Sequence, residues 1–220
     1  MDIYHIFRSP QGEGRLTGVE SLFVRTRGCL LRCWFCDTPE ASKPSDEKER
    51  NELSVGEIVE RLDELGSDVQ HVVITGGEPF LQPDLAKLTQ LLRSRGKHIT
   101  IETSGSLSQE GVVCDLLSVS PKLTIPQYRF SPDVLQTLLM QADDYQIKLV
   151  VDSPADCESV EDFLQSQSGS NLNLDRSKVM LMPQGKTLDE LRRQEEWLAP
   201  YCLANNLTFC PRKQIEWGVE

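Results

Sequence analysis

The chain has 220 residues, 39% of them hydrophobic, and its 23 Lys and Arg against 34 Asp and Glu give a formal net charge of -11. This length suits one compact domain over residues 1–220, which buries about 70% of its unfolded surface without help from disulfides or a structural metal. The acidic balance argues against direct binding to nucleic acid or to an anionic membrane, because both select clustered Lys and Arg. With no signal-like start and no run of about 18 apolar residues, we expect a cytoplasmic protein.

Short β-rich runs alternate with amphipathic segments along the chain. The runs read like strands buried on both faces of a parallel sheet and cover 21–27, 71–75, 98–103, 112–119, 147–151, 178–182 and 207–210. Helical periodicity predicts helices over 54–66, 83–95, 132–143, 154–167 and 187–204. This alternation predicts an α/β fold with right-handed crossovers, but too few strands for a complete eightfold barrel of about 250 residues. We therefore expect an incomplete, trimmed (β/α) barrel.

Side chains at several helix starts have the spacing of capping motifs. Capping boxes, in which a hydroxyl and a carboxylate each bond the other residue's backbone, are predicted at Ser54 with Glu57 and at Thr187 with Glu190. A hydroxyl cap before proline at the first helical position is predicted at Ser131 and at Ser153.

Three of the seven cysteines, Cys29, Cys33 and Cys36, form a C-x3-C-x2-C run directly after the strand expected at 21–27. Zinc would need a fourth ligand from elsewhere in the chain. Three thiolates instead suit a [4Fe-4S] cluster that leaves one iron open to a substrate or cofactor. The remaining cysteines are expected to be buried, small apolar side chains: Cys114, Cys157, Cys202 and Cys210.

A TGGEP turn at 75–79 follows the strand expected at 71–75. Alone, this turn is also typical of an ordinary connection from strand to helix. Its glycines, however, would let a ligand approach the backbone closely. The turn therefore indicates a ligand site only in combination with the cysteine run that precedes it.

Together, the cysteine run at 29–36 and GGEP at 76–79 resemble the radical S-adenosylmethionine (SAM) superfamily. The resemblance implies that the three cysteines hold the cluster, that SAM binds its fourth iron, and that SAM is cleaved reductively to a 5′-deoxyadenosyl radical. It also implies SAM contacts from Phe35, beside adenine, and from Gly76, Gly77, Glu78 and Pro79.

Further motifs are similar to those of the 7-carboxy-7-deazaguanine synthase family: QGEG at 11–14, FVRTRGC at 23–29, CDT at 36–38, ETSG at 102–105, SPK at 120–122 and MPQG at 182–185. The resemblance implies a carbon-nitrogen lyase that converts 6-carboxy-5,6,7,8-tetrahydropterin to 7-carboxy-7-deazaguanine with loss of ammonia, in queuosine biosynthesis and hence a tRNA modification pathway. It also implies a homodimer, and flavodoxin or ferredoxin as the reductant.

The implied substrate has a carboxylate and a pterin edge rich in donors and acceptors. Arg25 could bind the carboxylate bidentately. Catalytic roles are expected for Glu13, Arg25 and Glu102. Substrate contacts are expected from these three residues and from Gln11, Gly12, Thr75 and Thr103. The alternatives are structural: a turn at QGEG, a surface arginine, and capping of the loop after strand 98–103.

The family's Mg²⁺ ligand corresponds to Thr38, and Asp37 is expected to orient a metal-bound water. An Asp-Thr pair that merely caps its loop is the alternative. By the same resemblance, Ser120, Lys122 and Gln184 match positions near the ribose, carboxylate and adenine of SAM.

Two other readings remain open. One is another small radical SAM enzyme, such as an activase that makes a glycyl radical on a partner protein, although QGEG and CDT argue against it. The other is a non-catalytic iron-sulfur module for electron transfer, in which TGGEP would have no role. The tail 211–220 has Lys213 and Gln214 where the family often has a histidine, and the polar stretch 39–52 predicts a solvated loop or a lid.

Overall fold

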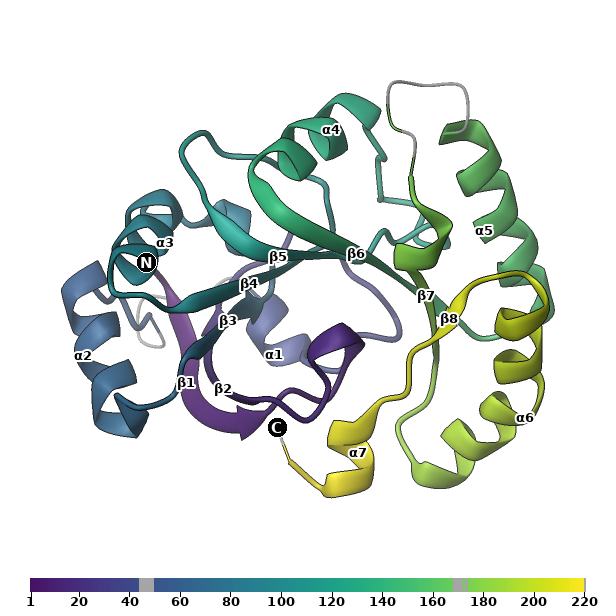
Figure 1. Ribbon diagram of the computed structural model, residues 1–220, viewed down its shortest axis with the longest axis horizontal. Helices are drawn as coiled ribbons and strands as arrows, with labels where there is room; N and C mark the ends of the chain where they lie inside the picture. The colour runs from purple at the N-terminus through teal and green to yellow at the C-terminus, as the bar shows by residue number, and fades with distance from the viewer. Residues whose placement is uncertain (44–49, 168–171, 173, 220) are drawn as a thin grey trace.

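The computed structural model describes residues 1–43, 50–167, 172 and 174–219, and its centre is a curved sheet of eight strands (Figure 1). The strands lie in chain order, β1 antiparallel to β2 and all later neighbours parallel. Their bounds are β1 Ile3–Pro10, β2 Glu20–Thr26, β3 His71–Gly76, β4 His98–Thr103, β5 Cys114–Val119, β6 Ala142–Val151, β7 Val179–Pro183 and β8 Thr208–Phe209. No pairing joins β1 to β8 among the described residues, so the predicted incomplete barrel is confirmed.

In the described part of the chain, five long helices lie around the outside of the curved sheet, and the short α1 and α7 lie nearer its open side (Figure 1). The helix bounds are α1 Pro39–Ser42, α2 Val55–Gly66, α3 Leu85–Ser94, α4 Pro132–Met140, α5 Pro154–Gln167, α6 Leu188–Ala204 and α7 Lys213–Trp217. The five predicted helices are therefore confirmed. None of the described helices combines the length and apolar character needed to cross a membrane.

The sequence pattern missed one strand and shortened another. Strand β1 carries exposed polar residues between its buried ones, so it lacks the continuous apolar run used to find the others. Strand β6 begins at Ala142, well before the predicted 147–151, and α4 ends at Met140 instead of 143. The early part of β6 is polar because Asp144 and Gln146 bond Arg15 and Ser118.

Helix capping follows the sequence in three cases and departs from it in one. Both capping boxes form, and the Ser131 hydroxyl accepts from the backbone of Val134. The prediction for Ser153 is wrong, because its hydroxyl donates to the Asp156 carboxylate at 3.2 Å. That carboxylate also accepts the backbone N–H of Ser153 at 2.9 Å. The carboxylate is the stronger acceptor, and it ties the two residues before α5 to the first turn of the helix.

The two faces of the sheet differ in character. The outer face packs apolar side chains such as Leu22, Val72 and Ile101 against the helices in one large core. The inner face has only small apolar clusters, such as Phe7 with Phe23, and otherwise buries polar groups. Buried polar groups require partners. The inside of the open barrel is therefore where chemistry is to be sought.

Candidate active site

A cavity of about 710 Å³ lies at the carboxyl ends of the parallel strands and extends into the barrel. In α/β barrels these strand ends carry the functional loops. Of the side chains predicted from the sequence, the cavity is lined by Gln11, Gly12, Glu13, Arg25, Cys29, Cys33, Phe35, Cys36, Asp37, Thr38, Thr75, Gly76, Gly77, Glu102, Thr103, Ser120, Lys122 and Gln184. Glu78 and Pro79 are buried beside this cavity and are not part of its lining.

Close backbone packing joins the TGGEP turn to the cysteine loop. The N–H of Glu78 donates to the Gly28 carbonyl at 2.8 Å, and the N–H of Gly77 donates to Thr26 at 3.1 Å. A Cβ on Gly77 would lie 1.9 Å from the Gly28 oxygen, and Gly76 has a φ of +124°. Both positions therefore require glycine, for space at one and for conformation at the other.

Glu78, for which the resemblance implies a SAM contact, has its side chain buried at the end of β4. It is 1% exposed, and its carboxylate accepts from the Thr103 hydroxyl at 2.7 Å and from the Ser104 hydroxyl at 2.6 Å. It also accepts the Ser104 N–H at 3.0 Å. The side chain therefore ties the TGGEP turn to the end of β4 and fixes the neighbouring strand ends relative to each other.

The three predicted cluster cysteines are free, half-buried thiols on one wall of the cavity. Burial raises the pKa of Cys29 and also that of Cys33, where the nearby Lys122 charge opposes the effect. Among the described residues, no three His, Cys, Asp or Glu side chains are close enough to hold a single metal ion. The thiols instead spread along the wall, which fits a cluster in which each thiolate binds a different iron.

An aromatic and a cationic side chain lie next to the cysteine loop. The Lys122 ammonium lies 5.9 Å from the centre of the Phe35 ring and donates to the Ser120 hydroxyl at 2.6 Å. Burial lowers the pKa of Lys122. A second hollow of about 230 Å³ adjoins the cavity and shares Phe35 and Gln184 with it. An aromatic face beside an amide suits a flat heterocycle.

Two acidic side chains share a lysine on the inner face of the barrel. The Lys148 ammonium donates to Glu13 at 2.7 Å and to Glu102 at 3.2 Å. The other oxygen of Glu102 accepts from the Thr75 hydroxyl at 2.8 Å, and the Gln11 amide lies 3.4 Å from the carboxylate. The structure therefore brings together the acidic groups predicted from QGEG and ETSG, through a lysine that was not predicted.

Neighbouring charges decide whether Glu13 and Lys148 are ionised. Burial favours neutral Glu13, but the Lys148 and Arg212 charges outweigh burial and lower its pKa to about 2. Burial likewise opposes the charge on Lys148, whereas Glu102 and Glu13 raise its pKa above the usual range. A lysine inside the apolar run IKLVV was the available signal for this residue, because a charge in a buried strand needs a partner.

Arg25 stands on β2 beside this group, and its guanidinium lies 4.9 Å from the centre of the Phe7 ring. It lines the cavity and is half-buried. Within the described ranges no carboxylate forms an ion pair with it. Arg25 is therefore a cation available to an anionic group entering the cavity.

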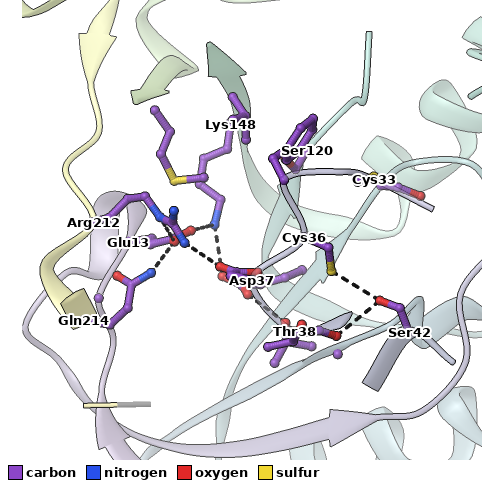
Figure 2. Close-up of a pocket in the computed structure, with 18 of the residues that line it drawn as sticks. Glu13, Cys33, Cys36, Asp37, Thr38, Ser42, Ser120, Lys148, Arg212 and Gln214 are labelled. Atoms are coloured by element: carbon purple, nitrogen blue, oxygen red, sulfur yellow. Dashed lines mark hydrogen bonds and ion pairs between the residues drawn. The ribbon is translucent and has the colours of Figure 1, made fainter. Parts of the chain in front are cut away.

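The carboxyl-terminal tail lies across the cavity. Arg212 is 8% exposed, donating to the Asp37 carboxylate at 2.6 Å and to the Gly185 carbonyl at 2.5 Å (Figure 2). The Gln214 amide donates to Glu13 at 2.5 Å, and Lys213 donates its N–H to Gly12. Gln214, one of the two residues found where the family often has a histidine, thus contacts Glu13. No sequence pattern marked Arg212.

The expected magnesium residues, Asp37 and Thr38, lie between the cysteine loop and α1. Thr38 lines the cavity and begins α1, where its carbonyl accepts from Ser42. The Asp37 side chain is 55% exposed and ion-paired with Arg212. Pro39 and Ser42 also line the cavity, and residues 44–49 of the stretch expected to form a solvated loop or a lid lie outside the described residues. A hydroxyl and a partly solvated carboxylate are oxygen ligands of the kind that Mg²⁺ accepts.

The remaining cysteines are buried as expected and lie outside the thiol wall: Cys114, Cys157, Cys202 and Cys210. Burial raises the pKa of Cys157 to about 11, and that of Cys210 likewise. Thiols of this kind are inert at neutral pH.

Solved structures support the same fold. The crystal structure of QueE from Escherichia coli matches with a TM-score of 0.74 and 27% sequence identity, over 96% of this chain and 92% of that chain. Streptococcus suis SuiB bound to S-adenosylmethionine matches with a TM-score of 0.57 over 84% of this chain and 48% of that chain. At 19% identity, the second match indicates a shared fold alone.

Sequence comparisons give the family. Residues 23–138 match the model of the Radical SAM superfamily. A 7-carboxy-7-deazaguanine synthase from Rhodopirellula baltica is 38% identical over 98% of this chain and 85% of its own length. The protein of the same name from Escherichia coli K12 is 31% identical over 87% of each chain. The cysteine, QGEG and ETSG motifs meet at one cavity. With these comparisons, the chain belongs to the radical SAM superfamily and, within it, to the 7-carboxy-7-deazaguanine synthase family.

Proposed function

We propose that this chain converts 6-carboxy-5,6,7,8-tetrahydropterin to 7-carboxy-7-deazaguanine with loss of ammonia, as a carbon-nitrogen lyase of the queuosine pathway. The observation that carries the proposal is the pairing, in one cavity, of the thiol wall with a charged wall made of Glu13, Arg25, Glu102 and Lys148. This charged wall offers two carboxylates and, in Arg25, a guanidinium with no ion-paired carboxylate among the described residues. An electron-transfer module has no use for the charged wall. A substrate with an anionic end and a donor-rich edge uses all of it.

In this proposal Arg25 binds the substrate carboxylate. Its guanidinium is fixed over the Phe7 ring and has no competing carboxylate among the described residues. A bidentate pair between guanidinium and carboxylate fixes both distance and orientation. Arg25 would therefore decide how the substrate is turned in the cavity as well as how tightly it binds.

Glu13 and Glu102 receive the other end of the substrate. The amino-pyrimidine edge of a pterin presents N–H donors, and ionised carboxylates accept such donors without donating in return. Gln11, Gly12, Thr75 and Thr103 border the same region and complete its hydrogen bonding. Catalytic roles are assigned to Glu13, Arg25 and Glu102, because these three would touch the reacting molecule.

The thiol wall would hold the cofactors. Cys29, Cys33 and Cys36 would ligate the [4Fe-4S] cluster, which together with SAM supplies a 5′-deoxyadenosyl radical for hydrogen abstraction. Gly76 and Gly77, which line the cavity, would present their backbone to the methionine part of SAM. The cofactor contacts proposed for the other side chains come from Phe35, Ser120, Lys122 and Gln184.

Further parts of the proposal concern metal, reductant and assembly. Thr38 would bind Mg²⁺ together with substrate oxygens, and Asp37, which Arg212 holds, would orient a bound water. Flavodoxin or ferredoxin would supply the electron, because the cysteine loop is reachable at Leu30 and Trp34, which are 56% and 63% exposed. A homodimer in the cytoplasm is the expected form, and sedimentation of the purified protein tests the dimer.

The function is tested by an anaerobic assay of the reconstituted protein with SAM, Mg²⁺, dithionite and 6-carboxytetrahydropterin. Mass spectrometry follows 7-carboxy-7-deazaguanine and 5′-deoxyadenosine in the same reaction. We expect both, and we expect both to disappear in C33A. The matched control is C157A, which removes a buried thiol from α5 outside the cavity.

The two products separate the possible failures. Deoxyadenosine without the deazaguanine would keep the radical chemistry and reject the substrate, leaving an activase or another small-molecule radical SAM enzyme. Neither product from a protein with full iron and sulfide would favour the electron-transfer module.

A further inference from the structure

Lys148 is a charged residue of the cavity to which the proposed function gives no role. It lies in the middle of β6, is 4% exposed, and points into the barrel. Its ammonium bonds Glu13 at 2.7 Å and Glu102 at 3.2 Å. One nitrogen therefore bridges the two carboxylates assigned to the substrate.

The charged groups around Lys148 come from several elements, and its two carboxylate partners differ in the cations near them. Glu13, in the turn after β1, also has Arg212 of the tail 3.5 Å away. For Glu102, on β4, Lys148 is the one cation within ion-pair distance among the described residues. Lys122, after β5, and Cys210, after β8, also act on the ammonium. Loss of Lys148 would therefore leave Glu102 without a counter-charge.

We propose that Lys148 is a positioning residue that keeps Glu13 and Glu102 ionised side by side and holds both carboxylates toward the pterin edge. The inference rests on the proposed function for its substrate. Its physical part, the shared ionisation of two neighbouring carboxylates, does not depend on that substrate.

The reason is electrostatic. Two carboxylates held near one another in a buried site do not both remain ionised unless a cation lies between them, and without it the pair binds a proton. A protonated carboxyl donates one hydrogen bond, so it is a poorer acceptor for the donor edge of a pterin. Without Lys148, substrate binding should then depend on removing that proton.

The first experiment needs no substrate. Infrared difference spectra of the reconstituted protein are compared for wild type, K148M, K148R and K178M at about pH 7. We expect a protonated-carboxyl band in K148M that is absent from wild type and from K148R. K178M is the matched control, since Lys178 is also ion-paired, with Asp144, but lies outside the cavity.

The band in K148M is assigned by a second substitution. In K148M with E102Q we expect it to vanish, because Glu102 has lost its cation whereas Glu13 keeps Arg212. No protonated carboxyl in a folded K148M would overturn the proposal, whatever the substrate turns out to be. Should K148M not fold, K148Q provides the same comparison, because glutamine also removes the charge but keeps polar atoms that can bond the carboxylates.

The second experiment measures equilibrium binding of 6-carboxytetrahydropterin to the SAM-loaded protein without reductant. For K148M we expect an affinity at least about tenfold weaker at pH 6.5, recovering by up to tenfold per pH unit as the pH rises. Wild type, K148R and K178M should change by less than about threefold over the same range. A flat profile for K148M overturns the positioning role, while failure of wild type to bind rejects the proposed substrate alone.

Discussion

The two walls of the cavity are built by different means. The cofactor wall, which is the thiol wall of Cys29, Cys33 and Cys36 together with Gly76 and Gly77, comes from two short contiguous segments. Backbone hydrogen bonds join these segments and leave no room for a Cβ at Gly77. The charged wall comes from single side chains far apart in the chain, such as Glu13 and Lys148. Close backbone packing therefore fixes the cofactor wall, whereas a balance of charges fixes the charged wall. Substitutions in the two walls should therefore impair activity in different ways.

The cofactor wall should be the more fragile, and G77A tests it most directly. The added Cβ would lie 1.9 Å from a backbone oxygen that cannot move without the cysteine loop. We expect product formation to fall about a thousandfold or more, because displacing a reacting group by about 1 Å already costs about a hundredfold. Iron content, 5′-deoxyadenosine release and thermal unfolding are measured together.

Gly56 gives the control for this substitution. It lies in α2, where the nearest atom to an added Cβ is 3.9 Å away. G56A should leave activity unchanged and stabilise the fold by about 0.5–1 kcal/mol, because alanine favours the helix. If G77A kept full cofactor cleavage, the two segments would not be locked together as described.

On the charged wall, R25Q should separate substrate binding from cofactor chemistry. Removing the guanidinium leaves the substrate carboxylate unpaired inside the cavity, which should lower kcat/KM about a hundredfold. Release of 5′-deoxyadenosine in the absence of substrate should not change, since Arg25 is not part of the thiol wall. Product is followed with substrate present and 5′-deoxyadenosine with substrate absent, and the two rates give the ratio.

The matched variant is R25K. Lysine keeps the charge but not the planar fork, so it should recover only part of the lost kcat/KM. Full recovery would mean that charge alone is read at this position. Equal losses of both products in R25Q would contradict the separation of the two walls.

The sequence predicted the cofactor wall well because its residues are neighbours in the chain. Cys29, Cys33 and Cys36 share one loop, and spacing alone indicates a common ligand. Glu78 illustrates what such a motif leaves open, because its carboxylate holds the end of β4. A motif letter gives the residue type but does not tell which way its side chain points.

The charged wall was predicted less completely because its contacts bridge long stretches of chain. Glu13 and Lys148 are 135 positions apart, and Arg212 and Asp37 are 175 apart. Motifs found the acidic members, but their cations stand in β6 and in the tail, where no motif marked them. Strand β1 was missed for a related reason, since its inner face is polar in part and breaks the apolar pattern.

Arg212 should matter less than Arg25, because its partners keep other support when it is lost. In R212M, Asp37 remains 55% exposed to solvent and Glu13 keeps Lys148. We expect kcat/KM to fall about tenfold, or about 1.4 kcal/mol, with faster proteolysis of the tail. R192M, an exposed arginine on α6, should change neither measurement, and an unaffected tail in R212M would exclude it as the tie to the cysteine loop.

The smallest effect is expected at Asp144, away from both walls. Its ion pairs resemble those of the charged wall but are partly exposed to solvent. Burial raises the pKa of Asp144, but hydrogen bonds from Lys178 and Arg15 outweigh it and bring the pKa to about 2, as for Glu13. The side chain of Asp144 is 34% exposed, against 12% for Glu13. Solvent should therefore screen this pair much more strongly.

For D144N we expect a loss of about 1 kcal/mol in the free energy of unfolding near neutral pH, with activity unchanged. Because the folded pKa lies below the ordinary value of 3.8, the stabilisation is present above about pH 4 and disappears as the pH falls toward 2. High salt should roughly halve the loss, since the pair is partly exposed. Denaturant titrations of D144N and of D189N, an exposed control on α6, measure this at several pH values. If the loss in free energy of unfolding persisted at pH 2 or did not depend on salt, Asp144 would act through packing. Solvent exposure would then not explain why its substitution has a smaller effect than substitutions in the charged wall.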